Sequence, residues 1–108
     1  MPKFITFFSY TGESAKAMID KPSDRSAAAR GLVESLGGTV ESFYWMQGKH
    51  DGFLIYSLPD NVPAAALGLA VASTGAITGV QTHEVYGAAE QAAIMATAKK
   101  VTYKPPTG

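Results

Sequence analysis

The stretch from Thr39 to Leu58, TVESFYWMQGKHDGFLIYSL, constrains the fold of this chain more than any other part. It contains two runs of aromatic and β-branched residues, separated by a short polar segment between Gly48 and Gly52. Such runs are typical of β-strands, and a short glycine-flanked connection is typical of a hairpin. Bulky apolar residues occupy both odd and even positions, so both faces of these strands should be covered.

The segments on either side of the hairpin predict further regular elements. Residues 3–10 are rich in aromatic and β-branched residues and predict a strand. A short helical turn is expected over residues 13–19, and Asp20 and Pro22 indicate the start of a second helix. Apolar side chains at helical spacing extend this helix over residues 23–36, and the glycines that follow end it.

The second half of the chain predicts two helices and one strand. Residues 62–72 carry no charged side chain, which predicts a helix buried on more than one side, with Asp60 as its N-cap. Residues 76–86 predict a fourth and more polar strand, consistent with a sheet edge. Residues 88–100 predict an alanine-rich helix that could dock through its apolar side chains.

This order of elements predicts an α+β domain of the ferredoxin-like type, β-α-β-β-α-β, with a four-stranded antiparallel sheet and an additional C-terminal helix. We expect one domain over residues 1–108, in which residues 101–108 form an extended tail. No internal repeat is evident beyond the β-α-β pattern.

A ferredoxin-like sheet carries its helices on one face and leaves the other bare. Strict alternation places Phe43 and Trp45 on one face of the hairpin, and Val40, Tyr44 and Met46 on the other. The bare face should carry either the opposite set or several of the following residues: Phe4, Phe8, Tyr44, Met46, Leu54 and Tyr56. Either patch is too large for a soluble monomer. Burying about 800 Å² per subunit would contribute about 20 kcal/mol before association costs, so we expect a homo-oligomer that pairs sheet to sheet.

Composition excludes several classes of function. Nine basic and nine acidic residues cancel, and no basic cluster is larger than Lys99–Lys100, so no nucleic-acid or anionic-membrane surface is expected. Cysteine is absent, which excludes disulfides and thiolate chemistry. The first ten residues do not resemble a signal peptide, and no apolar run is long enough to span a bilayer. We therefore expect a cytoplasmic protein.

Four residues are candidates for a ligand-binding site. Asp51 could act as a general base, or its carboxylate could accept backbone N–H groups in the turn. His50 could act as an acid, a base or a ligand, or could be an incidental loop residue. Trp45 could line a pocket for a flat apolar ligand, or could simply pack. His50 and His83 without a suitably spaced carboxylate make a weak metal site, so no metal and no cofactor are expected.

The run LGGTVESFYWMQGKHDGFLIYSLPD resembles the GYD domain family, as do the helices expected on either side of it. In this family a helix ending in LGG precedes a strand, a Gly-x-Tyr-Asp turn, an apolar strand and a proline–acid pair. Gly48 and Asp51 match the motif, whereas His50 stands where tyrosine is usual, so no role of that hydroxyl can be transferred. The resemblance covers about residues 3–87. It implies a ferredoxin-like fold within the dimeric α/β-barrel group and says little about activity.

These observations favour a small homo-oligomeric domain that binds a small molecule or stabilises an assembly. No arrangement of residues forms a catalytic signature, and no catalytic residue is assigned. One alternative is a cofactor-free monooxygenase- or isomerase-like enzyme, with a small aromatic or apolar substrate in a cavity near the sheet. A third reading, a regulatory module like the PII-type trimers, is disfavoured because the hairpin loop is much shorter than theirs.

Overall fold

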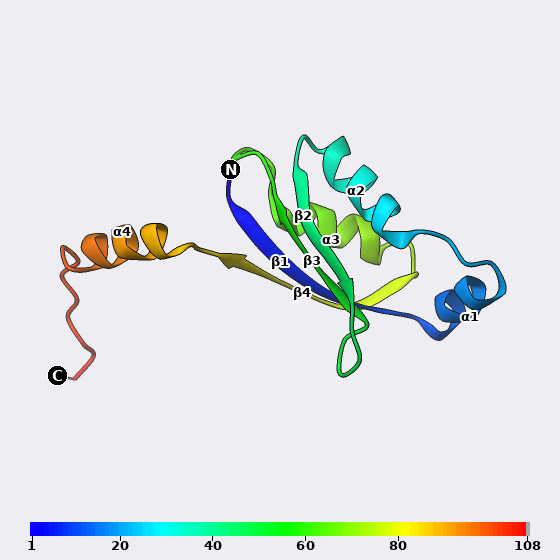
Figure 1. The fold of residues 1–108 in the computed structure, drawn as a ribbon. Helices are drawn as coiled ribbons and strands as arrows, with labels where there is room; N and C mark the ends of the chain where they lie inside the picture. Colours follow the sequence, from blue (N-terminus) through cyan, green and yellow to red (C-terminus); the bar gives the residue numbers. More distant parts are fainter. Residues whose placement is uncertain (108) are drawn as a thin grey trace.

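The computed structural model describes residues 1–107 and confirms the ferredoxin-like α+β fold (Figure 1). The four strands form one antiparallel sheet in the order β2-β3-β1-β4. The elements along the chain are β1 (Lys3–Tyr10), α1 (Gly12–Asp20), α2 (Arg25–Ser35), β2 (Thr39–Trp45), β3 (Gly52–Ser57), α3 (Ala64–Ala72), β4 (Ile77–Val85) and α4 (Ala88–Ala98). The polar strand β4 forms one edge of the sheet, as its sequence indicated.

Helices α2 and α3 pack on the same face of the sheet, and the core lies between them and the strands. Val33 from α2 and Leu67 from α3 meet the sheet side chains of Phe8, Leu54 and Tyr56. The hydroxyl of the fully buried Tyr56 is hydrogen-bonded to that of Thr6 at 2.8 Å, and Thr6 is in turn bonded to Thr82 at 2.9 Å. These bonds satisfy the polar atoms beneath the helices, which would otherwise destabilise the core.

A β-bulge in β2 corrects the expected arrangement of side chains in the hairpin. The pairing with β3 shifts between Val40, which faces Tyr56, and Ser42, which faces Ile55. The residue between them, Glu41, is therefore additional, and the alternation reverses after it. As a result Val40 and Phe43 share the helix-covered face, whereas Tyr44 lies on the opposite one.

The uncovered face of the sheet, called here the open face, carries the set opposite to Phe4, Phe8, Leu54 and Tyr56, with Tyr44 added by the bulge. Its apolar residues include Ile5, Phe7, Tyr44, Phe53 and Ile55. The Phe53 ring lies between those of Phe7 and Tyr44, with centroids 5.9 Å and 5.6 Å away. No helix of the described residues packs on these rings.

Three expectations about the helices were wrong in detail. Helix α2 begins after Asp24, because α1 continues to Asp20 and a short connection separates the two. Helix α3 begins after Pro63 and not at Asp60, since Pro59 and Val62 form a turn first. Within one chain α3 is covered on one side only: Leu67 is buried, but the neighbouring Leu69 is 73% exposed.

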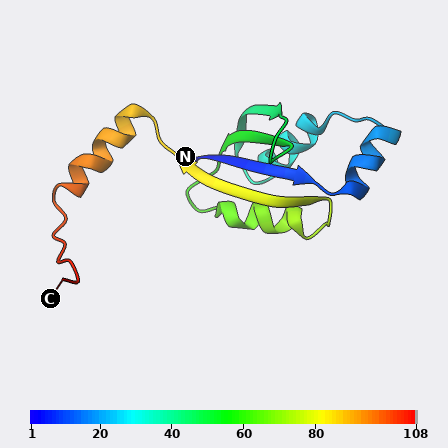
Figure 2. The same cartoon turned by 90° about the horizontal axis from the view of Figure 1, so that it is seen from below.

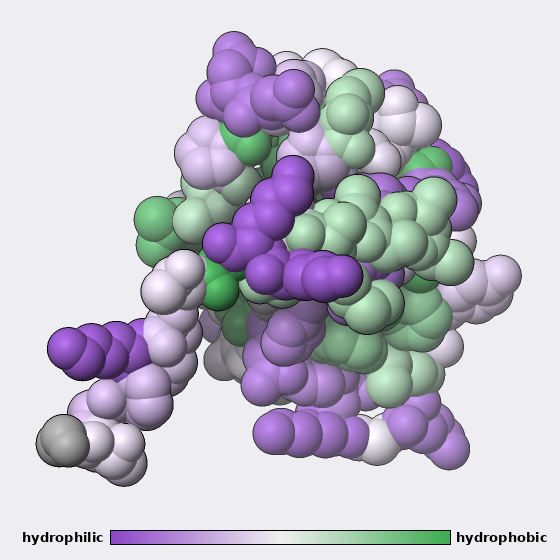
Figure 3. Space-filling model, turned by 90° about the vertical axis from the view of Figure 1, so that its left-hand side faces the viewer, coloured by the Kyte–Doolittle hydropathy of each residue, from purple (hydrophilic) through white to green (hydrophobic). Residues whose placement is uncertain are grey.

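Helix α4 projects away from the rest of the domain, beyond the end of β4, whereas α1 lies at the opposite end (Figure 1, Figure 2). Every residue from 86 to 98 is exposed, including Ile94 and Met95. Figure 3 shows this side of the molecule, where hydrophobic and hydrophilic side chains lie intermingled on the surface. The apolar side chains of α4 therefore do not dock on the chain's own sheet.

The end of α2 requires glycine at one position, and this generates a testable pair of substitutions. Gly37 has φ +84°, and the N–H groups of Gly37 and Gly38 donate to the carbonyls of Glu34 and Val33 at 2.9 and 3.0 Å. Gly37→Ala should lower the free energy of unfolding by about 1–2 kcal/mol, because an L side chain is strained in this conformation.

The same substitution at Gly31 is the matched control. Gly31 lies inside α2, and a Cβ there would meet no atom within 4 Å. Gly31→Ala should raise the free energy of unfolding by about 0.5–1 kcal/mol through helix propensity. Urea unfolding of both variants measures the two effects, and equal effects of the same sign would contradict the assigned helix end.

Candidate functional site

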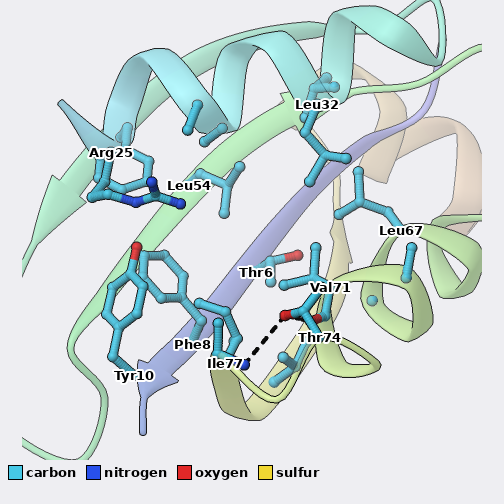
Figure 4. A pocket seen from close by; sticks show the side chains of 18 residues that line it. Thr6, Phe8, Tyr10, Arg25, Leu32, Leu54, Leu67, Val71, Thr74 and Ile77 are labelled. Carbon is cyan, nitrogen blue, oxygen red and sulfur yellow. Dashed lines mark hydrogen bonds between the residues drawn. The ribbon is translucent and has the colours of Figure 1, made fainter. Parts of the chain in front are cut away.

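A partly open cavity of about 310 Å³ lies between the sheet and helices α2 and α3 (Figure 4). We call it the inner cavity. The strands supply Phe8, Leu54 and Ile77 to its wall, and the helices supply Leu32 and Val71. The small side chains of both helices leave this space, because alanines and one glycine stand where larger residues would fill the gap. Apolar groups dominate the lining, which is typical of a site for a small organic molecule.

Two of the polar groups at the inner cavity already have partners. Thr6 is bonded to the hydroxyls of Tyr56 and Thr82, as described above. Thr74 donates to the carbonyl of Val71 at 2.8 Å and accepts from the backbone N–H of Ala76 at 3.2 Å. These hydroxyls belong to the scaffold.

Arg25, in contrast, has no such partner. Within residues 1–107 its guanidinium takes part in no hydrogen bond or ion pair, and its Nε atom is buried. The other arginine of α2, Arg30, donates to the carbonyl of Val40 at 3.0 Å. Figure 4 shows Arg25 projecting from the start of α2 at the same end of the cavity as Tyr10. This end is therefore the polar end of the inner cavity.

Asp24 determines where α2 starts and so where Arg25 is placed. Its carboxylate accepts from the backbone N–H groups of Ser26 at 3.0 Å and Ala27 at 3.3 Å, as an N-cap does. The hydroxyl of Ser26 also donates to it, and these hydrogen bonds lower the pKa of Asp24 below its usual value of 3.8. The carboxylate of Asp24 is thus already hydrogen-bonded to groups at the start of its own helix.

A second hollow, called here the outer hollow, lies beyond this end, between α1 and the hairpin. Tyr10 and Arg25 line both spaces, and Trp45 and Asp51 line the outer hollow. Trp45 is 55% exposed, and its ring stacks on that of Tyr10 with the centroids 5.4 Å apart. Trp45 therefore covers Tyr10 from outside and does not reach the inner cavity.

Asp51 connects the hairpin loop to the end of β1. One of its carboxylate oxygens accepts from the backbone N–H of Tyr10 at 2.8 Å, and its own N–H donates to the carbonyl of Phe8 at 2.9 Å. The carboxylate thus accepts a backbone N–H, although the donor comes from a neighbouring strand and not from the turn itself.

His50 and His83 lie on the open face, away from both hollows. Their rings flank Phe7, with centroids 5.5 Å and 6.4 Å from it, and Nδ1 of His50 is buried with no partner among residues 1–107. In residues 1–107 no three His, Asp or Glu side chains gather where a metal ion could be held. The four candidates from the sequence are therefore divided, with Trp45 and Asp51 at the outer hollow and the two histidines on the other face.

The sequence interpretation missed Arg25 at the polar end of the inner cavity, whereas from the sequence Tyr10 beside it could either orient a ligand by hydrogen bonding or simply pack. It placed Arg25 off the apolar stripe of its helix. Yet Arg25 precedes Ala29 by four residues and Leu32 by seven, which is the spacing of one helix face. This position of a charged residue in line with an apolar stripe was the feature of the sequence that could have indicated its role at the cavity.

Comparison with models of protein families identifies the family of this chain. Residues 4–95 match the model of the GYD domain. The chain belongs to the GYD domain family. The motif of this GYD domain lies in the loop from Met46 to Asp51, where Gly48 has φ +134°. No match was found among the curated proteins compared with this chain.

None of the helices in residues 1–107 has the length and apolar character needed to cross a membrane.

The role of Asp51 generates a second prediction. Asp51→Ala removes the acceptor of the Tyr10 N–H, so it should lower the free energy of unfolding by about 1–3 kcal/mol. Asp60→Ala is the control, because the Asp60 side chain is 89% exposed and should matter by less than about 0.5 kcal/mol. Chemical denaturation followed by Trp45 fluorescence measures both. Equal stability of wild type and Asp51→Ala would contradict the structural role.

Proposed function

We propose that this GYD domain binds a small apolar molecule in the inner cavity and does so as a homodimer. The main support for ligand binding is the presence of the inner cavity. Its volume, about 310 Å³, lies at the lower end of the range for small-molecule pockets, roughly 300–1,000 Å³. Protein interiors are normally packed without voids of this size. An apolar ligand would restore the missing contacts of Leu32, Val71 and Ile77 and remove their surface from water.

Binding is better supported than catalysis. The enzymatic alternative placed His50, Asp51 or His83 beside a cavity as a proton carrier, and none of the three lines the inner cavity. The hydroxyls of Thr6 and Thr74 are held by other protein groups. What remains is an apolar space with one cationic side chain, an arrangement that can recognise a molecule and offers no general base.

The open face supports the proposed homodimer. Phe7, Phe53, Ile5 and Ile55 are all only partly buried in one chain, and Tyr44 is 60% exposed. A second copy placed sheet to sheet would cover these residues, as in the dimeric α/β-barrel arrangement. Stable interfaces bury about 800 Å² per partner. A contiguous aromatic and aliphatic surface on a four-stranded sheet suits such an interface.

Helix α4 gives a further reason to expect a second copy. An isolated helix of 11 residues is marginally stable in water even when it is rich in alanine, because nucleation is costly. Its exposed apolar residues Ile94 and Met95 would gain from packing on a partner. We therefore include α4 in the proposed subunit contact.

Ligand binding can be tested with octanamide, a neutral molecule of suitable size. In NMR titration of the labelled protein, the amide signals of Leu32, Leu67 and Ile77 should shift most. Val71→Trp should abolish the shifts by filling the inner cavity. Leu69→Trp, two residues away on the exposed side of α3, should leave them unchanged. Shifts confined to the open face, or retained in Val71→Trp, would contradict the proposed site.

Dimerisation is tested by a charge on the open face. Wild type should sediment near twice its chain mass of 11.3 kDa at micromolar concentration. Phe53→Glu should sediment as a monomer, because a carboxylate at the centre of the interface would be buried without a partner. Ala27→Glu on the exposed side of α2 is the control and should remain a dimer. A monomeric wild type would overturn the proposed dimer. The proposed binding site would be unaffected, because the titration with octanamide tests it separately.

A further inference from the structure

We infer that the ligand of the inner cavity is an amphipathic carboxylate whose anionic group binds Arg25. This inference rests on the proposed function and specifies the class of ligand. It is drawn from the position of one guanidinium, which is unpaired within the described residues and stands at one end of an otherwise apolar space.

The state of Arg25 calls for an anion. Its Nε is buried and donates to no atom of residues 1–107, and no acidic side chain among them lies within ion-pair distance of it. Arg25 as a whole is half-buried, and a buried N–H donor without a partner is destabilising. Arginine presents its donors as a planar fork, which matches the two oxygens of a carboxylate.

The acidic groups near Arg25 do not supply this anion. Asp24, its neighbour in sequence, is held by the N–H groups and the hydroxyl at the start of α2. Asp51, which also lines the outer hollow, accepts from the backbone N–H of Tyr10. The lining of the inner cavity contains no Asp or Glu from the described part of the chain. The guanidinium of Arg25 is therefore available to pair with the anionic group of a ligand that enters the cavity.

The geometry also orients such a molecule. Figure 4 places Arg25 and Tyr10 at one end of the cavity, and Leu32, Leu67 and Val71 at the other. The carboxylate would bind Arg25. The Tyr10 hydroxyl, which makes no hydrogen bond within residues 1–107, would donate to it as well. The apolar part would extend between α2 and α3. At about 30 Å³ for each water-sized group, the cavity accommodates roughly ten non-hydrogen atoms.

The test compares octanoate with octanamide, which share an apolar chain and differ in the charge of the head group. Isothermal titration calorimetry on the full chain should show octanoate binding wild type at least about tenfold more tightly, as expected for hydrogen bonds to a charged group. Arg25→Gln should reduce this preference to within about twofold, by weakening octanoate alone. Its melting temperature should not fall, because no observed bond of Arg25 is lost.

Two further variants make the comparison specific. Lys21→Gln removes one positive charge from an exposed position just before α2, and it should keep the full preference for octanoate. Arg25→Lys restores the charge without the planar fork, so it should restore part of the preference. A preference lost equally in Lys21→Gln and Arg25→Gln would show a general charge effect and would overturn the inference.

The outcomes separate this inference from the function on which it rests. If both molecules bind in the inner cavity with equal affinity, or if Arg25→Gln keeps the preference, the role of Arg25 is wrong and the cavity proposal stands. If neither molecule binds, or if both still bind to Val71→Trp, the inner cavity is not the site and both proposals fail. Preference for octanoate that depends on Arg25 and on an open cavity supports both.

Discussion

The sheet of this domain has two apolar faces, and residues 1–107 provide helices for only one of them. Helices α2 and α3 bury Phe8, Leu54 and Tyr56, while in this part of the chain no helix covers the rings of Phe7 and Phe53 on the reverse side. Burial of apolar surface is the main force that stabilises such a fold. The inner cavity and the open face both follow from how completely apolar surface is buried on each face of the sheet.

On the helix side the cover is incomplete because the helices are built from small residues. Ala28 and Ala29 of α2 and Gly68 of α3 lie at the inner cavity and do not fill it. The wall is nevertheless well determined, since Thr6 and Tyr56 are fixed by hydrogen bonds and Asp24 fixes the start of α2. The space that we propose as the binding site would therefore be largely formed before a ligand arrives.

The sequence was sufficient to predict the fold class and the family, because both depend on patterns that extend over many residues. It could not predict which face Tyr44 occupies, since the bulge at Glu41 is an effect of pairing with β3 and leaves no clear local signal. It also could not show that α3 would be covered on one side only. The hydrophobicity of Leu69 indicates that its burial would be favourable. It does not indicate whether the residues that bury it belong to the same chain.

The candidate site was predicted only in part, for a similar reason. The selection of Trp45, His50, Asp51 and His83 relied on the chemistry of single residues, and the fold distributes them over two faces. Arg25 was passed over because a charged residue near a helix start normally faces water. Its position over the inner cavity follows from packing of α2 against the sheet, which no local pattern specifies.

The most direct test of the central claim is an isotope-filtered NOE measurement on a mixture of labelled and unlabelled chains. The account predicts NOEs between chains that join the methyl groups of Ile5 and Ile55 to the rings of Phe7, Tyr44 and Phe53. Absence of such NOEs, with the same groups exposed to a water-soluble paramagnetic probe at high protein concentration, would contradict it.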